Sequence, residues 1–314
     1  MTDFPLLLES IRDLEDEHIK KIFELAKCFK EGSKSTPSSF FSPLSPPLIA
    51  TNFFENSTRT KLSFTVAIKK IGAIPMDLGE AGSSLAKGES LRDTFLTQKA
   101  IGIKLGIVRS ANSGELNRFK QSLPYPMINA GDGMHQHPTQ ALIDLFTMLE
   151  LGLEVQNATM VIIGDSLHSR VSHSLIDLFP RLGGKLILCG PHGCLPEFID
   201  SENIKIEHCL ETALRSADWV YQLRVQKERH KVFSNKGFFN EYFTNYGLST
   251  EKLDKLNIKP LIFNPGPAAI GTEISEKLIR SDLYMGNKQV ENSVPIRMAL
   301  LWLMLEQLHK EGRL

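Results

Sequence analysis

A segment of the 314-residue sequence that runs from Phe53 to Lys61 (FFENSTRTK) combines hydroxyl and guanidinium groups between a predicted strand and a predicted helix. A helix N-terminus presents unpaired N–H groups and a partial positive charge, which suit an anion. Ser57, Thr58 and Thr60 add hydroxyl donors. Arg59 adds a fork of N–H groups that matches phosphate oxygens. Because helix capping alone needs one hydroxyl, we predict an anion site here.

A second segment, residues 129–140 (NAGDGMHQHPTQ), places His137 and Gln140 at the start of another predicted helix. Both side chains can donate to a carbonyl or phosphoryl oxygen, and the proline between them suits a first helical turn. A metal pair formed by His135 and His137 is the alternative, but the sequence shows no third ligand nearby. Arg109 ends a predicted strand, where an α/β protein would use it in a site.

Arginines also follow two later strands. Arg170 opens a helix after residues 159–164, and Arg224 follows residues 218–223, with Gln226 on the same face if that strand continues. Ligands of open α/β sheets bind outside the carboxyl ends of strands, so these side chains are candidates for an anionic ligand. Solvated charged loops are the alternative.

Three smaller features complete the candidate residues. The turn 264–267 (NPGP) contains Gly266 and Pro267, whose peptide bond can be cis and whose backbone could approach a ligand. Lys87 lies in a glycine-flanked loop. A cysteine- and histidine-containing stretch at 189–209 lacks a standard zinc spacing, so we expect its cysteines to be ordinary thiols and predict no metal.

Alternating apolar segments must position these residues. Periodicity predicts strands at 48–54, 103–109, 127–130, 159–164, 185–189, 218–223 and 260–263, and helices at 6–31, 58–71, 138–151, 169–182 and 289–310. Such alternation predicts right-handed βαβ units and mostly parallel sheets. The pattern restarts near residue 150, which favours two α/β domains.

Composition narrows the classes of function. The 36 basic and 36 acidic residues balance, which argues against a nucleic-acid partner or a polybasic membrane surface. Hydrophobic residues make up 42% of the chain, an ordinary value for a globular protein. We see neither a membrane-spanning segment nor a signal peptide in the sequence. Four cysteines in a chain of this length do not indicate a disulfide framework. The expectation is a cytoplasmic protein.

Five motifs in order resemble the catalytic chains of aspartate carbamoyltransferase, in the aspartate/ornithine carbamoyltransferase family. They are FFE-x-STRT, His-Pro-Thr-Gln, His-Ser-Arg-Val, Leu-Arg-Val-Gln-Lys-Glu-Arg and Pro-Gly-Pro, and the resemblance continues to residues 296–299 (IRMA). The ornithine-specific branch fits less well, because it has His-Pro-Cys-Gln and a Ser-Met-Gly motif. The resemblance implies an α/β fold of two doubly wound parallel-sheet domains joined by crossing helices, with the C-terminal helix returning to the first domain.

The resemblance also implies which substrate each domain binds and which residues contact it. Residues 1–145 with 289–314 would bind carbamoyl phosphate, and residues 146–288 would bind L-aspartate. The carbamoyl-phosphate contacts would be Ser57, Thr58, Arg59, Thr60, Arg109, His137, Gln140, Gly266 and Pro267, of which Arg59, Thr60, Arg109 and His137 would be catalytic. The aspartate contacts would be Lys87, Arg170, Arg224 and Gln226. No cofactor is implied.

The implied assembly is a homotrimer in which the loop of Lys87 reaches a neighbouring site, either alone or with regulatory chains or a dihydroorotase. Two other functions stay open: a carbamoyltransferase with another amine acceptor, and a silent trimeric scaffold. The chain departs from the family pattern at Asn56, Lys61, Thr65 and residues 268–269, where proline, arginine, glutamate and an arginine-containing segment are usual. These departures bear on domain closure more than on the chemistry.

Overall fold

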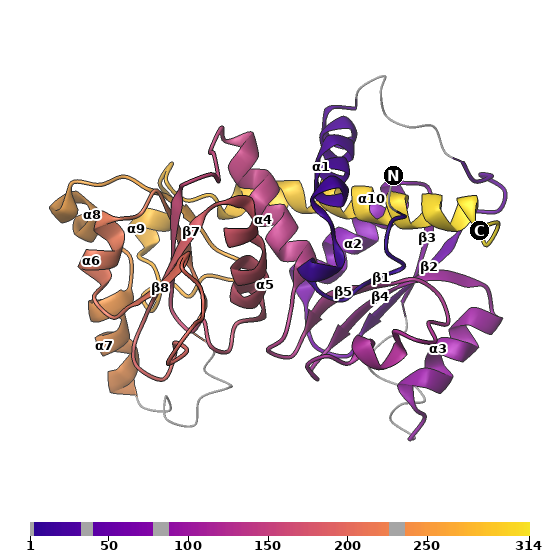
Figure 1. The fold of residues 1–314 in the computed structure, drawn as a ribbon, viewed down its shortest axis with the longest axis horizontal. Coiled ribbons are helices and arrows are strands. Elements are labelled where there is room, and N and C mark those ends of the chain that lie inside the picture. Colours follow the sequence, from indigo (N-terminus) through magenta and orange to yellow (C-terminus); the bar gives the residue numbers. More distant parts are fainter. Residues whose placement is uncertain (1–2, 33–39, 78–87, 226–235) are drawn as a thin grey trace. The chain divides into compact units, whose positions relative to one another are not determined.

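The computed structural model describes residues 3–32, 40–77, 88–225 and 236–314. The chain forms two compact units (Figure 1). Unit 1 comprises Met1–Phe146 and Asn292–Leu314, and unit 2 comprises Thr147–Glu291. Each unit contains one five-stranded sheet whose strand pairs are all parallel. The expected α/β class and the parallel sheets are therefore confirmed.

The sheet of unit 1 has the strand order β1-β5-β4-β2-β3. Figure 1 shows α1, α2 and α10 on the side of this sheet opposite α3. The elements of unit 1 are β1 (Leu7–Leu8), α1 (Asp16–Glu31), β2 (Leu48–Phe53), α2 (Thr58–Lys70), β3 (Ile74–Asp77), α3 (Leu91–Ala100), β4 (Ile103–Ser110), β5 (Met127–Asp132) and most of α4 (Pro138–Glu150). Helix α10 (Gly286–Lys310) brings the chain back to this unit.

The sheet of unit 2 has the strand order β10-β9-β6-β7-β8. An apolar cluster on one face joins side chains of α6, α8 and α9 to alternate residues of the strands, such as Val161 and Ile163. On the other face the rings of Phe179 and Trp219 pack edge to face. The elements are β6 (Thr159–Ile163), α5 (Arg170–Leu178), β7 (Lys185–Cys189), β8 (Ile204–Glu207), α6 (Leu210–Arg215), β9 (Trp219–Gln222), α7 (Lys236–Tyr246), α8 (Thr250–Leu256), β10 (Leu261–Phe263) and α9 (Glu276–Ile279).

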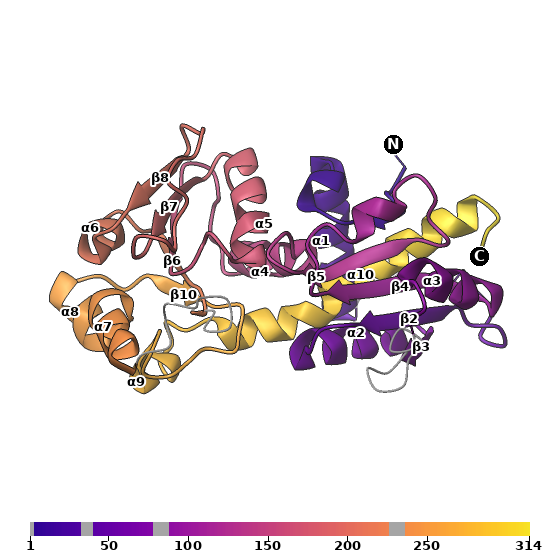
Figure 2. The same cartoon turned by 90° about the horizontal axis from the view of Figure 1, so that it is seen from below.

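Each sheet is doubly wound, so each has a topological switch point, where successive connections leave in opposite directions. In unit 1 the strand that follows β2, β3, pairs with one edge of β2. The next strand, β4, pairs with the other edge of β2. In unit 2 it leaves β6 for β7 and β8, and then crosses to β9 and β10 (Figure 2). Ligands of such sheets bind at the carboxyl ends of the two strands that flank the switch point. Those strands are β2 and β4 in unit 1, and β6 and β9 in unit 2.

The N-terminal helix predicted at 6–31 was wrong at its start. Leu7 and Leu8 form a short strand that pairs with β5, and α1 begins only at Asp16. Both leucines are buried, as expected for a strand inside a parallel sheet. Strands β3 and β8 were also missed. Both are short, and β3 is largely exposed, so neither has the apolar run that marks the central strands.

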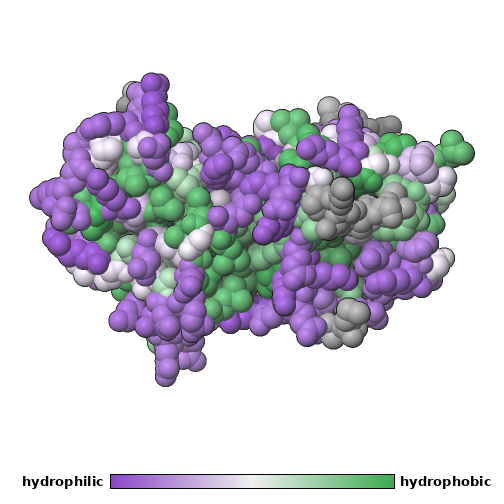
Figure 3. Space-filling model, turned by 90° about the horizontal axis from the view of Figure 1, so that it is seen from above, coloured by the Kyte–Doolittle hydropathy of each residue, from purple (hydrophilic) through white to green (hydrophobic). Residues whose placement is uncertain are grey.

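On the face drawn in Figure 3, polar side chains cover much of the surface and apolar residues gather in smaller groups. None of the helices built from the described residues combines the length and the apolar character that crossing a membrane requires.

Candidate active site

The first switch point carries the predicted anion site. Ser57 is the N-cap of α2 in extended conformation (φ −160°, ψ 102°), and the first turn of the helix contains no acidic residue. Thr58 and Arg59 are exposed, whereas Thr60 is buried. Within the described part of the chain, the Ser57 hydroxyl makes no capping hydrogen bond. The first turn of this helix combines N–H groups, hydroxyls and a guanidinium with no acidic residue of its own, as an anion site requires.

Arg109 lies on the strand next to this turn. It pairs in register with Phe53, and its side chain is only 10% exposed. Its Nε lies 3.3 Å from Oε2 of Glu55, and its Nη1 donates to the carbonyl of Ala130 at 3.1 Å. Contacts from the end of β2 and from β5 therefore hold the guanidinium at the edge of the sheet. The sequence predicted that Arg109 ends its strand, and β4 continues one residue further, to Ser110.

His137 and Gln140 lie at the start of α4. His137 is buried, and its carbonyl accepts from the backbone N–H groups of Gln140 and Ala141 at 3.0 and 3.3 Å. The Oγ1 of Thr139 lies 3.5 Å from its Nδ1. Gln140 is half-buried, and its Nε2 donates to Oδ1 of Asp144 at 2.7 Å. Both predicted side chains are thus anchored at the helix start.

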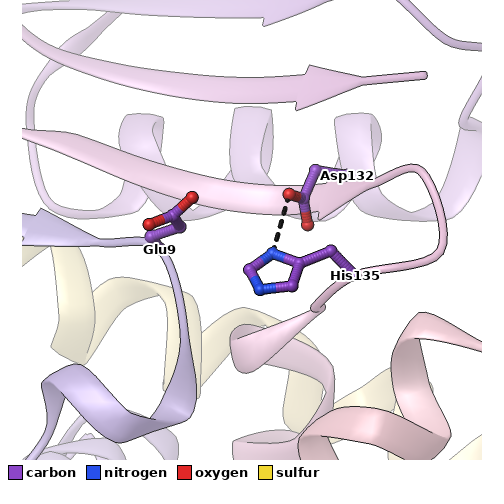
Figure 4. Close-up of side chains that lie close together, drawn as sticks. All are labelled: Glu9, Asp132 and His135. Atoms are coloured by element: carbon purple, nitrogen blue, oxygen red, sulfur yellow. Dashed lines mark hydrogen bonds and ion pairs between the residues drawn. The ribbon is translucent and has the colours of Figure 1, made fainter. Parts of the chain in front are cut away.

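A cluster of Glu9, Asp132 and His135 holds the loop that leads to His137 (Figure 4). One oxygen of Asp132 accepts from the N–H of Gly114 at 2.6 Å and contacts Nδ1 of His135 at 3.0 Å, and the other accepts two further hydrogen bonds. The sequence showed no third ligand near His135, whereas the fold brings two carboxylates to it. These hydrogen bonds of Asp132 hold the loop before His137 in place.

The second switch point carries Arg170 and Arg224. Arg170 is the first residue of α5, whose N-cap Ser169 accepts from the N–H of Ser172 at 3.2 Å. Arg224 follows β9, and both arginines are half-buried. The buried carboxylate of Glu273 accepts from the N–H of Val225 at 2.6 Å, which holds the chain directly after Arg224. Each arginine follows a strand, as the sequence predicted, and the structure adds that these two strands, β6 and β9, are neighbours in the sheet.

The turn after β10 is tied to β9. Asn264 donates from Nδ2 to the carbonyl of Gln222 at 2.8 Å, and its Oδ1 accepts from the N–H of Gly266 at 2.7 Å. The Gly266–Pro267 peptide bond is cis, and Gly266 has φ of 65°. Glu273, through its second oxygen, also accepts from the N–H of Ala269 at 2.8 Å. One carboxylate thus holds both this turn and the segment after Arg224.

Two predicted site residues, Lys87 and Gln226, lie outside the described residues. The cysteines and histidines at 189–209 do not come together as three ligands of one metal in the part of the chain that the structure describes. Instead, the rings of His192 and His208 stack with centroids 3.8 Å apart, and Cys189 and Cys194 are buried. Burial raises the pKa of each of these two thiols to about 12.

Comparison with known families shows that the two halves of the chain match two domains of one family. Residues 8–150 match the aspartate/ornithine carbamoyltransferase carbamoyl-P binding domain, and residues 156–304 match the Asp/Orn binding domain of the same family. The chain belongs to the aspartate/ornithine carbamoyltransferase family. The second match extends beyond the compact unit 2, because it includes residues of α10 that pack in unit 1.

Relatives within the aspartate/ornithine carbamoyltransferase family are similar over nearly the whole chain. The aspartate carbamoyltransferase catalytic subunits of Desulforamulus reducens and Carboxydothermus hydrogenoformans are 39% and 38% identical, with 95% of each chain covered. The catalytic subunit of M. jannaschii aspartate transcarbamoylase has a TM-score of 0.82 at 30% identity, covering 98% of this chain and 100% of that one. The Trypanosoma cruzi enzyme, solved with aspartate and phosphate, has a TM-score of 0.79 at 25% identity and 94% coverage of both chains.

The departures from the carbamoyltransferase pattern have local explanations. Lys61 pairs with Asp77 on β3, with Nζ 2.9 Å from Oδ2. Thr65 donates from its hydroxyl to the carbonyl of Lys61 at 2.9 Å, so it is satisfied within its own helix.

Sequence reasoning missed a buried group behind the carbamoyltransferase site. Arg297 on α10 is 2% exposed, and its Nη1 donates to Oγ of Ser63 at 2.6 Å. Burial lowers the pKa of Arg297 to about 9, and Asp144 partly opposes that shift. In the sequence Arg297 stood out only as part of the Ile-Arg-Met-Ala segment of the family resemblance, which gave it no role. Its partners are far away in the chain, so no motif spacing could reveal them.

Proposed function

We propose that this chain transfers the carbamoyl group of carbamoyl phosphate to the amino group of L-aspartate, giving N-carbamoyl-L-aspartate and phosphate in pyrimidine biosynthesis. The observation that carries the proposal is the N-terminus of α2, with its hydroxyls and Arg59, beside Arg109 at the switch point of the first sheet. The names of the most similar relatives support the same activity.

In this proposal residues 1–145 with 289–314 bind carbamoyl phosphate. Ser57, Thr58, Arg59 and Thr60 bind the phosphate, because a helix N-terminus and an arginine fork both complement its charge. The carbamoyl group is contacted by Thr60, Arg109, His137, Gln140 and the backbone of Gly266 and Pro267. Of these groups, Arg59, Thr60, Arg109 and His137 act on the charge that develops during the reaction.

Residues 146–288 bind L-aspartate in this proposal. Arg170 and Arg224 bind its two carboxylates with Gln226 and Lys87, since guanidinium groups pair with carboxylates through two parallel hydrogen bonds. The arginines lie at the carboxyl ends of β6 and β9, where a doubly wound sheet binds its ligands. The Trypanosoma cruzi relative was solved with aspartate and phosphate, which supports the same pairing of ligands here.

The chemistry needs no covalent enzyme intermediate. The neutral amine of aspartate attacks the carbamoyl carbon, and the carbonyl oxygen gains negative charge, which Thr60, Arg109 and His137 stabilise. The bond from the carbamoyl carbon to the phosphate oxygen then breaks, phosphate leaves, and the amine proton passes to the departing phosphate. Holding the two substrates in order supplies much of the acceleration.

We further propose a cytoplasmic homotrimer whose neighbouring subunit contributes Lys87. Leu62 and Val66 on α2 and Ile74 and Met76 on β3 are large apolar side chains that are at least 41% exposed. Strand β3 is an edge of its sheet, and exposed apolar edges are commonly covered by another chain. Light scattering after size-exclusion chromatography tests the trimer, and co-elution tests partnership with regulatory chains or a dihydroorotase.

The activity is tested by incubating purified protein with carbamoyl phosphate and L-aspartate, and measuring phosphate and carbamoyl aspartate. We expect equal amounts of both products. A parallel panel with ornithine and other amines tests the alternative acceptor, which would be favoured by a higher kcat/KM for any of them. Absence of product with every amine, from a folded trimer, would instead support a silent scaffold.

A further inference from the structure

The buried Arg297 is hydrogen-bonded to the helix that forms the anion site. Its Nη1 donates to Oγ of Ser63 at 2.6 Å, and its guanidinium carbon lies 4.7 Å from the centre of the Phe64 ring. A guanidinium only donates hydrogen bonds, so the proton of the Ser63 hydroxyl must point elsewhere. The Ser63 Oγ lies 2.7 Å from the carbonyl oxygen of Arg59 and 3.0 Å from that of Thr60. Arg297 therefore fixes the direction of a hydroxyl that ties down the first turn of α2.

Asp144 on α4 orients the side chain of Gln140, as Arg297 orients the hydroxyl of Ser63. Its side chain is fully buried, and its charge favours the charged form of Arg297. An ionised carboxylate only accepts hydrogen bonds, so the group that Gln140 turns toward Asp144 must be its NH2. The 2.7 Å contact from Nε2 of Gln140 to Oδ1 of Asp144 has this polarity. The planar amide of Gln140 therefore places its oxygen, Oε1, at the position that does not contact Asp144.

The orientation of an amide is normally ambiguous, because its nitrogen and oxygen have nearly the same shape. Here the Asp144 carboxylate removes the ambiguity, and its charge favours the charged form of the buried Arg297 guanidinium. A buried carboxylate without such a counter-charge would be costly. The order of dependence is therefore Arg297, then Asp144, then Gln140.

We propose that Asp144 and Arg297 are positioning residues that present the Gln140 oxygen as the acceptor for the carbamoyl NH2 group, and so set the preference for carbamoyl phosphate over acyl phosphates without N–H donors. The inference rests on the proposed function, because it takes Gln140 as a carbamoyl contact. A site built to accept from an N–H group discriminates against an analogue that lacks it.

Acetyl phosphate is the probe, since it has a methyl group in place of the NH2 group and the same phosphate. The Kd of each ligand is measured by calorimetry without aspartate. For the unaltered chain we expect carbamoyl phosphate to bind about tenfold more tightly than acetyl phosphate. In Asp144→Asn the side chain can offer either oxygen or NH2 to Gln140, so we expect the ratio to fall to about twofold. The Kd for inorganic phosphate should change less than about twofold, because Gln140 does not bind the phosphate.

The matched control is Gln307→Leu, a change of another buried polar side chain on α10, which should leave the ratio unchanged. If Asp144→Asn does not fold, the double variant Asp144→Asn/Arg297→Met has the same expectation, because it leaves no buried charge without its partner. An unchanged ratio in a folded variant, or an equal fall in the control, overturns the inference.

Failure of the proposed function gives a different result. The binding ratio needs no turnover and no amine acceptor, so a preference that depends on Asp144 would support the inference even if aspartate were not the acceptor. A chain that binds neither carbamoyl phosphate nor acetyl phosphate overturns both proposals. A chain that turns over both acyl phosphates with aspartate equally well overturns the inference alone.

Discussion

Nη1 of Arg297 and Oγ of Ser63 lie 2.6 Å apart, although the two residues are 234 positions apart in the sequence. The contact joins the C-terminal helix to the second turn of α2, one turn after the predicted anion site. Because the Ser63 hydroxyl is also 2.7 Å from the carbonyl oxygen of Arg59, Arg297 supports, through Ser63, the backbone of the arginine that we propose binds phosphate.

Ser63→Ala should weaken phosphate binding without changing the choice of carbamoyl donor. The variant leaves a buried guanidinium N–H without its acceptor, which costs about 1–3 kcal/mol of stability. We expect the Kd for inorganic phosphate to rise about three- to tenfold. The ratio of the Kd values for carbamoyl and acetyl phosphate should stay the same, because Asp144 still orients Gln140. A fall in that ratio would mean that the Arg297–Ser63 contact and the Asp144–Gln140 contact do not act independently.

Arg59→Ala should abolish most activity and leave the fold intact. The side chain is exposed, so its loss creates no cavity, and the charge that it offers to phosphate is absent. We expect kcat/KM to fall at least about a hundredfold, the range seen when a preorganised donor to developing charge is removed. Steady-state kinetics and thermal melting test both parts. Arg118→Ala is the control, since that side chain is 77% exposed in the same unit.

Glu9→Gln should change the pH dependence of stability. Burial raises the pKa of Glu9 above 4.5, with His135 opposing the shift and Asp132 adding to it. The folded state therefore keeps the proton to higher pH than the unfolded chain, and stability from this group is lost as pH rises above 4.5. Glutamine can still accept from the N–H of Asn117, as Glu9 does at 3.0 Å. Relative to the unaltered chain, the variant should gain stability between pH 4 and pH 7 in urea melts. A constant difference across that range would contradict the assignment.

Cys209 should react first with thiol reagents. It is the exposed N-cap residue of α6, and hydrogen bonds from the Thr212 hydroxyl and N–H lower its pKa. Burial raises the pKa of Cys189 and Cys194 to about 12 and also shields them. Brief treatment of the native protein with iodoacetamide at pH 8, followed by peptide mass spectrometry, should show alkylation of Cys209 before either buried cysteine. Equal labelling of all three would indicate that unit 2 opens readily.

Much of the fold could be predicted because its central strands and helices have strong periodicities. The helix at 58–71 matches α2, and the strand at 185–189 matches β7 residue for residue. The failures lie where local pattern and tertiary environment disagree. Leu7 and Leu8 continue an apolar run with helical spacing, but pairing with β5 makes them a strand. Strand β3 is an exposed edge, so no buried alternation marks it.

In the candidate site, too, some residues could be predicted from the sequence and others could not. Motif residues such as Arg109 and His137 could be found because strand ends and helix starts are visible in the sequence. Asp144 and Arg297 could not, because the role that we propose for them depends on their burial and on the contacts of Asp144 with Gln140 and of Arg297 with Ser63. Glu9 likewise meets His135 only after β1 has paired with β5.

The return of α10 to unit 1 also sets an order for folding during synthesis. Residues 147–291 form a continuous unit that can close as soon as it leaves the ribosome. Unit 1, although translated first, lacks residues 292–314 until that moment has passed, and with them the cation that compensates Asp144. Domains generally complete folding from the N-terminus during translation. Here the later-translated unit can finish first, and the turn of α2 that we propose binds phosphate gains its support from Arg297 only after that.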